Sequence, residues 1–240
     1  MIRVLLFLQL LLFISCGGQH MKYQTSTYDD SEFESFVNSQ QEKLRELDKA
    51  EVFRSIHAKL FTALPEEHQN YFTTKPDYRL LSFAKGDLFL NQKQDFALVV
   101  YDAKNVRISI LVIDENRNRY NELFRDIKVE NGLENVECHY HSSRTPDYQI
   151  GDEIVYQAHS LMENPEEFLD FTLCKITPIS KDESFITDEG CFSMNEKKEE
   201  LLNINSLSVS TSFVYNNWES LKYDKKRELF TIFYGQAFAD

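Results

Sequence analysis

Apolar and polar residues repeat with a helical period in the first part of the chain. Between residues 31 and 64, apolar side chains recur every three or four positions, as on one face of an amphipathic helix. Ser31 followed by Glu34 fits a capping box at the start of this segment, and Pro65 marks its end. The pattern predicts one long or two consecutive helices that pack on the domain through their apolar face, although such a face could also bind a partner.

From Tyr78 the period changes to that of β-strands. Short runs rich in β-branched and aromatic residues are separated by polar turns, which is typical of an antiparallel meander. The predicted strands cover 79–83, 95–101, 106–113, 120–124, 136–141, 154–159, 168–179, 207–215 and 229–234, and a short charged helical turn covers 196–202. We therefore predict a single α+β domain over 31–240, in which amino-terminal helices at 31–64 pack on a mostly antiparallel β-sheet meander within a β-rich 78–240.

The beginning of the chain has a third pattern. Residues from Val4 to Ile14 are apolar except for Gln9, follow the basic Arg3 and run into small residues. Crossing a bilayer takes about 20 apolar residues, so this run is too short. The order of basic, apolar and small segments is that of a secretion signal, and we expect residues 1–15 to be a signal peptide that is removed.

The end of this signal, Phe13-Ile14-Ser15-Cys16, resembles the lipobox of bacterial lipoproteins, although leucine is usual where Phe13 stands. In that family, cleavage falls just before a cysteine whose thiol carries a diacylglycerol. The resemblance implies that Cys16 is the lipid-attachment residue and that residues 16–30 form a lipid-anchored flexible tether. The alternative is an ordinary secreted protein that is cut after Gly17.

The same resemblance implies a place in the bacterial cell envelope. Gly17 is not an aspartate, so the inner-membrane retention signal known in some bacteria is absent, and the outer membrane is the expected location. The expected partner is therefore a membrane, which the protein contacts through its lipid anchor.

Composition narrows the function classes. The 240 residues are 42% hydrophobic and 13% aromatic, which is enough for a packed core and excludes global disorder. The formal net charge is −13, and such a surface repels the phosphates of nucleic acids, so we expect no nucleic-acid partner.

The cysteine count argues against a disulfide scaffold. With Cys16 assigned to lipid, Cys138, Cys174 and Cys191 remain, and an odd number leaves at least one unpaired. Either all three are buried apolar thiols, or one disulfide exists, for which Cys174 and Cys191 are the nearest pair in the sequence.

Residues 83–115 resemble one unit of the FG-GAP type, the repeat of integrin-like propeller blades that also occurs in single copies in bacterial lipoproteins of unassigned function. The segment has a glycine-aspartate pair, a polar loop, a buried strand, a turn and a second strand. In that family the loop binds calcium, and Asp87, Asn91 and Asp95 match its first, fifth and ninth positions.

The loop also departs from the family pattern. Phe89 stands where an oxygen ligand is expected, and Gln92 replaces the glycine of the tight turn. Calcium prefers six to eight oxygen ligands, so these changes weaken a calcium site. The alternative is that Asp87 and Asp95 accept hydrogen bonds from turn amides and place the following strand. One unit also falls short of a propeller, which needs at least four blades.

Two other groups could form binding sites. On a strand, His139 and His141 would share one face and could provide half of a zinc shell, with His159 as a further ligand; they could equally be exposed histidines. The only tryptophan, Trp218, could form an aromatic platform for a sugar or a protein with Tyr215 and Tyr223, or it could pack at the edge of the core.

No catalytic motif accompanies these groups. The chain has no nucleophile elbow, P-loop, H-E-x-x-H or paired C-x-x-C sequence, and neither His57 nor His68 has a partnered nucleophile nearby. We therefore expect no catalytic residue, metal or cofactor. The leading interpretation is a lipid-anchored cell-envelope protein with a non-enzymatic binding or structural role, with an unknown protein or glycan as partner. The alternatives are an envelope hydrolase whose site is assembled from distant residues, or an immunity-type inhibitor of a basic toxin.

Overall fold

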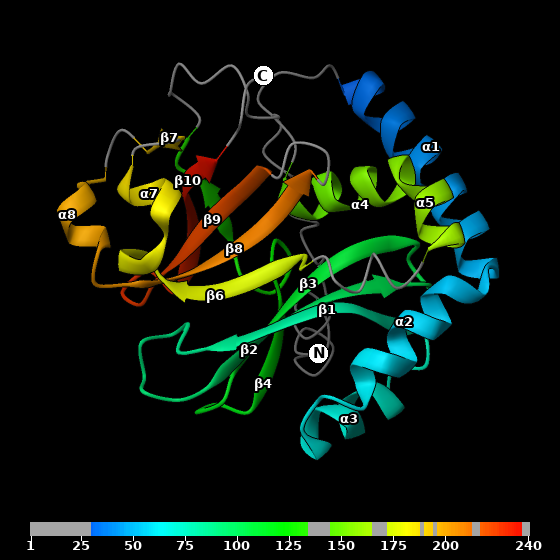
Figure 1. The fold of residues 1–240 in the computed structure, drawn as a ribbon, viewed down its shortest axis with the longest axis horizontal. Coiled ribbons are helices and arrows are strands. Elements are labelled where there is room, and N and C mark those ends of the chain that lie inside the picture. The colour runs from blue at the N-terminus through cyan, green and yellow to red at the C-terminus, as the bar shows by residue number, and fades with distance from the viewer. Residues whose placement is uncertain are drawn as a thin grey trace, which may run out of the picture.

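The computed structural model describes residues 30–133, 145–164, 172–187, 190–193, 196–212 and 217–236. Helices and strands are both abundant, and the chain has the predicted α+β class. Two β-sheets lie one over the other, with helices α1 to α3 along one side and α7 and α8 at the opposite side (Figure 1). No helix in these residue ranges is both long enough and apolar enough to cross a membrane.

The amino-terminal helical prediction is confirmed. Two consecutive helices, α1 (Asp30–Lys49) and α2 (Glu51–Phe61), are separated at Ala50, whose extended backbone interrupts the helical path. A third helix that was not predicted, α3 (Glu66–Thr73), begins directly after Pro65. The helix α2 ends at Phe61, before Pro65, and Pro65 occupies the N-cap position of α3. The side chains of the predicted capping box lie outside the described residues.

The predicted meander is the first sheet. Its four antiparallel strands follow the chain order: β1 (Tyr78–Gly86), β2 (Asp95–Asp102), β3 (Arg107–Asp114) and β4 (Arg119–Glu122). Every residue of β2 is buried, so neither face of this strand reaches solvent. A sheet buried on both faces must be covered by other elements on each side.

The second sheet is mixed. Its order is β5-β10-β9-β8-β6, with β7 paired to β10, and only β5 runs parallel to its neighbour. The strands are β5 (Val129–Asn131), β6 (Cys174–Pro178), β7 (Cys191–Phe192), β8 (Asn205–Ser212), β9 (Asn217–Asp224) and β10 (Leu229–Gln236). The other elements are α4 (Pro146–Tyr156), α5 (Ala158–Glu163), η1 (Ile179–Lys181), α7 (Glu183–Ile186) and α8 (Lys198–Leu201). The helix α8 lies within the helical turn predicted at 196–202.

The prediction of a strand at 154–159 is wrong, because α4 and α5 occupy this segment. Pro146 stands at the first turn of α4, where its missing N–H and fixed φ favour a helix start. Ile150 and Ile154 lie one helical turn apart, and both are fully buried. The predicted strand at 136–141 lies outside the described residues.

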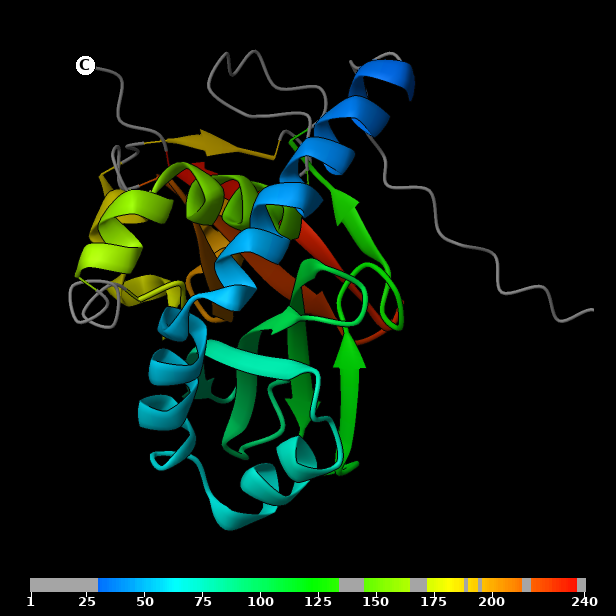
Figure 2. The same ribbon diagram turned by 90° about the vertical axis from the view of Figure 1, so that its right-hand side faces the viewer.

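The main core fills the space between the two sheets. Ala97, Val99 and Tyr101 of β2 pack there with residues of β8, β9 and β10 and with α1, α2 and α4. In Figure 2, α1 and α2 descend along this side of the molecule past α4. The opposite face of β2 carries Phe96 and Leu98, which α3 and the end of α2 cover.

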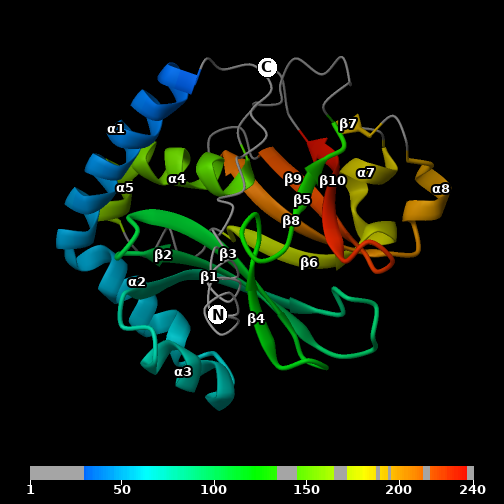
Figure 3. The ribbon, with the colours of Figure 1, turned by 180° about the vertical axis from the view of Figure 1, so that it is seen from behind.

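A third cluster covers the far side of the second sheet. Phe233 and Tyr234 of β10 pack against η1, α7 and α8, with Phe185 fully buried among them. Figure 3 shows this sheet from behind, with β5 beside β10. The two sheets and the helices around them therefore bury three apolar layers.

The two sheets come closest where β1 meets β6. Gly86 ends β1 against Ile176, and a Cβ atom built on Gly86 would lie 2.5 Å from Ile176 Cγ2. Non-bonded carbon atoms normally stay about 3.5–4.0 Å apart. The glycine of the glycine-aspartate pair is thus needed for close packing between the sheets.

We predict that Gly86→Ala lowers the free energy of unfolding by about 1–3 kcal/mol, because the added methyl overpacks this contact. Urea denaturation measures the change. Ile176→Ala removes Cγ2, the atom nearest to the added methyl, so the double variant should lose less stability than the sum of the two single variants. Strict additivity would show that the contact does not limit residue 86.

Candidate functional site

The structure brings the three predicted calcium-ligand positions together. The loop between β1 and β2 folds so that the Asn91 N–H donates to Asp87 Oδ1 at 2.7 Å, and Asn91 Nδ2 donates to Asp95 Oδ1 at 3.4 Å. Asn91 Nδ2 also lies 3.3 Å from Asp114 Oδ1 at the end of β3. Asp87, Asn91 and Asp95 are therefore linked by hydrogen bonds within one loop.

The carboxylate oxygens in this loop already accept hydrogen bonds. Asp87 Oδ2 accepts from the Gln92 N–H at 3.1 Å, and Asp95 accepts from the N–H groups of Phe89 at 2.9 Å and Glu115 at 3.3 Å. Amide hydrogens that point at the carboxylates occupy positions that a cation would need. The alternative prediction, hydrogen bonding of Asp87 and Asp95 to turn amides, is confirmed.

The two departures from the family pattern have structural roles. Phe89 is buried and packs edge-on against Tyr223 and Phe230, which docks the loop on the second sheet. Gln92 adopts a φ of 64°, the left-handed region in which a glycine is favoured. Asn205 Nδ2 donates to the Asp87 carbonyl at 2.7 Å and ties the loop to β8. The loop is therefore a connector between the sheets.

A second polar cluster lies near this loop, and no spacing of residues in the sequence indicates it. Glu67 and His68 come from the first turn of α3, and Glu115 follows β3. One ligand atom from each residue lies within 4.8 Å of the other two. His68 Nε2 is 3.2 Å from Glu115 Oε1, and both atoms are buried without a hydrogen-bond partner.

Aromatic rings hold the His68 side chain in place. Its Nδ1 is 2.6 Å from the Tyr120 hydroxyl, and its ring packs edge-on against Phe96 at 4.4 Å between centroids. Tyr71 stacks on Tyr120 and fixes that ring in turn. Burial, with help from Glu115 and Glu67, raises the pKa of Tyr120 to about 12, so the phenol keeps its proton at neutral pH.

The charges around this cluster are acidic. Burial raises the pKa of Glu115, and the carboxylates of Glu67, Asp95 and Asp114 raise it further. Burial lowers the pKa of His68, and Glu67 opposes this shift. Both pKa shifts favour the neutral forms, and the neighbouring carboxylates contribute to the shift of Glu115 but oppose that of His68. A bound cation would relieve this arrangement.

The other described histidine of the amino-terminal helices has a structural role. His57 Nδ1 on α2 accepts a hydrogen bond from the Leu80 N–H at 3.0 Å, at the free edge of β1. Burial lowers the pKa of His57, and Arg79 lowers it further. A neutral imidazole is needed to accept this bond, so His57 satisfies a buried edge amide.

The predicted pairing of Cys174 with Cys191 is wrong. Cys174 is a free, fully buried thiol, and its burial raises its pKa to about 12. Cys191 is disulfide-bonded to a cysteine outside the described residues. The prediction of one disulfide is therefore right, but Cys174 is an apolar core residue at the start of β6. Cys138 and Cys16 lie outside the described residues.

The predicted aromatic platform is not formed by Trp218 and Tyr223. These residues are an odd number of positions apart on β9, so their side chains point to opposite faces. Lys175 Nζ lies 4.4 Å from the Trp218 ring, whereas Tyr223 packs against Phe230. Tyr215 lies outside the described residues.

The predicted histidine zinc site is left with one described member. His159 is an exposed residue on α5 that pairs with Glu163 at 3.2 Å. His139 and His141 lie outside the described residues.

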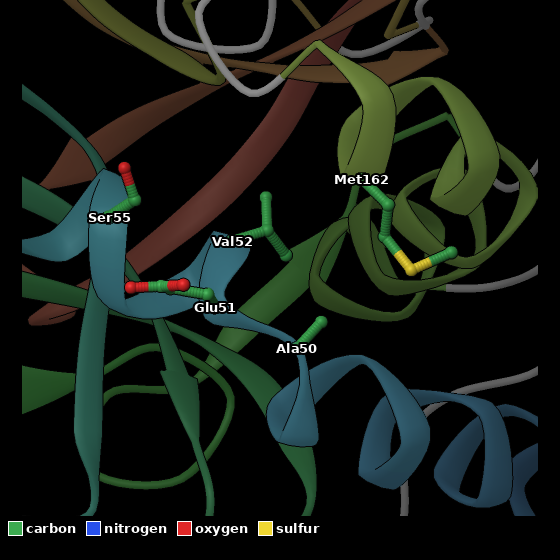
Figure 4. Close-up of a pocket in the computed structure, with 5 residues that line it drawn as sticks. All are labelled: Ala50, Glu51, Val52, Ser55 and Met162. Carbon is green, nitrogen blue, oxygen red and sulfur yellow. The ribbon is translucent and has the colours of Figure 1, made fainter.

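A pocket of about 350 Å³ lies between the start of α2 and α5 (Figure 4). Ala50, Val52 and Met162 form its apolar walls, and Glu51 and Ser55 are its polar residues. Met162 is 52% exposed, so the pocket opens to solvent. Glu51 is the one titratable residue among those that line the pocket, so the lining does not contain an acid–base pair.

We predict that Asp95→Ala lowers the free energy of unfolding by about 2–5 kcal/mol, because it removes the acceptor of two backbone amides in a buried position. Asp87→Ala is the matched control and should cost less, since its loop amides can reach water. Chemical denaturation measures both. About 1 mM calcium should leave the melting temperature of the wild type unchanged, and a clear rise would instead favour a calcium site.

We predict that His57 makes the stability depend on pH. Its folded-state pKa lies below the unfolded value, so its contribution is present above about pH 6.5 and is lost as the pH falls through the folded-state pKa. His57→Ala should cost about 1–3 kcal/mol at neutral pH, because the Leu80 N–H loses its acceptor. His57→Asn keeps an acceptor and should lose the pH dependence that His57 adds. Urea denaturation from about pH 5 to about pH 8 tests this, and parallel pH profiles for wild type and His57→Asn would contradict it.

Comparison with known proteins adds no family. No family model, no curated protein and no solved structure matches the chain. Its function therefore has to be argued from its residues and their geometry.

Proposed function

We propose that the protein is a lipid-anchored component of the bacterial cell envelope, with a non-enzymatic binding or structural role. The anchor is a diacylglycerol on Cys16, and the residues up to about 30 link it to the folded domain. The observation that carries the proposal is the disulfide at Cys191. Disulfides persist outside the reducing cytosol, so a disulfide-bonded domain behind a signal-like segment is consistent with export.

The anchor accounts for membrane attachment without a spanning helix. Each buried methylene contributes about 0.8 kcal/mol, and two or more acyl chains give stable anchoring where one gives marginal attachment. The acidic body, with a net charge of −13 for the whole chain, would be repelled by anionic headgroups. Acyl chains at Cys16 are therefore the part of the molecule suited to hold it at a membrane.

The domain supports a binding or structural role better than catalysis at its pocket. The polar residues of that pocket, Glu51 and Ser55, have no histidine beside them among the lining residues. The nearby helices instead display apolar surface, because Tyr156 is 75% exposed and Met162 is 52% exposed. Exposed apolar groups of this size are suited to contact another molecule.

One observation favours the second candidate, an envelope hydrolase assembled from distant residues. Glu67 and His68 meet Glu115 across a long stretch of sequence, which gives a carboxylate and an imidazole in contact. The pocket described above lies elsewhere, between α2 and α5, and none of these three residues lines it. The binding role therefore remains the leading proposal.

We predict that labelled palmitate is incorporated into the protein in its native host and that Cys16→Ser abolishes the label. The lipid is bound to this one thiol, so membrane fractionation of the variant should show loss of attachment. Cys174→Ala is the matched control, because its buried thiol cannot reach the acyl-transfer machinery, and it should keep the label. Recovery of the intact wild type from the medium with an unmodified Cys16 would refute the anchor.

A further inference from the structure

Two buried polar atoms face each other at α3 within ion-pair distance but without a hydrogen bond. His68 is 1% exposed, and its Nε2 is 3.2 Å from Glu115 Oε1, yet neither atom has a hydrogen-bond partner. The in-plane direction of the imidazole nitrogen therefore points past the carboxylate oxygen. Buried polar atoms without partners cost about 1–3 kcal/mol each, so such a pair calls for a third participant.

We propose that Glu67, His68 and Glu115 bind a divalent transition-metal ion, with Zn²⁺ as the representative ion. One ligand atom from each residue lies within 4.8 Å of the others. A tetrahedral ion with bonds of about 2.0–2.2 Å separates its ligand atoms by about 3.3–3.6 Å. The 3.2 Å between His68 Nε2 and Glu115 Oε1 is close to that separation, so both can reach one ion with small side-chain adjustments.

The imidazole is oriented for this role. The Tyr120 hydroxyl oxygen, 2.6 Å away, can accept a hydrogen bond from the Nδ1–H group. In this tautomer the Nε2 lone pair is available to a metal. Metal-binding histidines usually donate their other ring nitrogen to such a partner, which fixes the tautomer and the ring direction. Contacts with Phe96 restrict the ring further, so little reordering is needed on binding.

A proton between His68 Nε2 and Glu115 Oε1 satisfies the two atoms less well than a metal ion would. A hydrogen on Nε2 would lie along the ring plane, and that direction does not make a hydrogen bond with Glu115. A metal ion can accept lone pairs from both atoms at about 2 Å each. It also brings positive charge to a place that Glu67, Asp95 and Asp114 make negative.

The donor set distinguishes this site from the loop of Asp87 and Asp95. That loop offers oxygen atoms that backbone amides already occupy. At α3 the ligand atoms include an imidazole nitrogen, which suits zinc and similar transition metals better than calcium or magnesium. Three protein ligands leave a fourth position for water, and the exposed Glu67 provides the open side.

The test is a metal titration of the full-length protein as isolated from its host, after treatment with a chelator. Isothermal titration calorimetry should show one Zn²⁺ site, with no comparable heat for Ca²⁺ or Mg²⁺. The X-ray absorption spectrum at the zinc edge should show nitrogen and oxygen ligands, including one imidazole, and no sulfur.

Variants assign the site. Glu67 is exposed, so the Glu67→Gln variant should fold normally. This variant should weaken Zn²⁺ binding by at least about tenfold, and so should Glu115→Gln and Tyr120→Phe. Glu66→Gln, one residue earlier on α3, is the matched control and should bind as wild type does. His159→Gln removes a surface histidine that also pairs with a glutamate at 3.2 Å, and it should have no effect.

Two results would overturn the proposal. One is a wild-type protein that binds no Zn²⁺. The other is undiminished Zn²⁺ binding in both Glu67→Gln and Glu115→Gln.

Discussion

The burial of β2 on both of its faces is the constraint on which the rest of this structure depends. A strand without a solvent face needs a cover on each side, and here one cover is the second sheet with α4, while the other is α3. The first cover brings Gly86 against Ile176 and Phe89 against Phe230. The second cover, α3, places the His68 ring against Phe96 and its Nε2 beside Glu115. The connector loop and the proposed metal site are therefore both consequences of covering one strand.

Two neighbouring groups of carboxylates have different environments. In the loop, backbone amides donate hydrogen bonds to the carboxylate oxygens of Asp87 and Asp95. At α3, Glu115 Oε1 and His68 Nε2 are buried without such donors. Burial of a polar group is unfavourable unless a partner compensates for it, and this difference separates a structural role from a ligand-binding one. The pattern of hydrogen bonds discriminates between them, whereas the mere presence of acidic residues does not.

The proposed metal site and the proposed envelope location are independent but compatible. The disulfide at Cys191 and the proposed anchor at Cys16 bear on where the domain works, and the cluster at α3 bears on what it would bind there. An ion joining Glu67 and His68 to Glu115 would fasten α3 to the first sheet. A domain held at a membrane surface by acyl chains leaves such a site open to the surrounding compartment.

The sequence by itself determined the helices before Pro65, the antiparallel meander after Tyr78 and the convergence of the 87–95 loop. Each of these follows from residues that are close in sequence, through a period of 3.6 or 2 or through a turn. The same local logic failed at Ile154, where a run of β-branched and aromatic residues suggested a strand. The segment instead forms a helix, which places Ile150 one turn before Ile154. Only the tertiary structure decided that Cys174 is free and that His68 meets Tyr120, 52 positions away. Such contacts depend on which elements cover β2, and no local period encodes that choice.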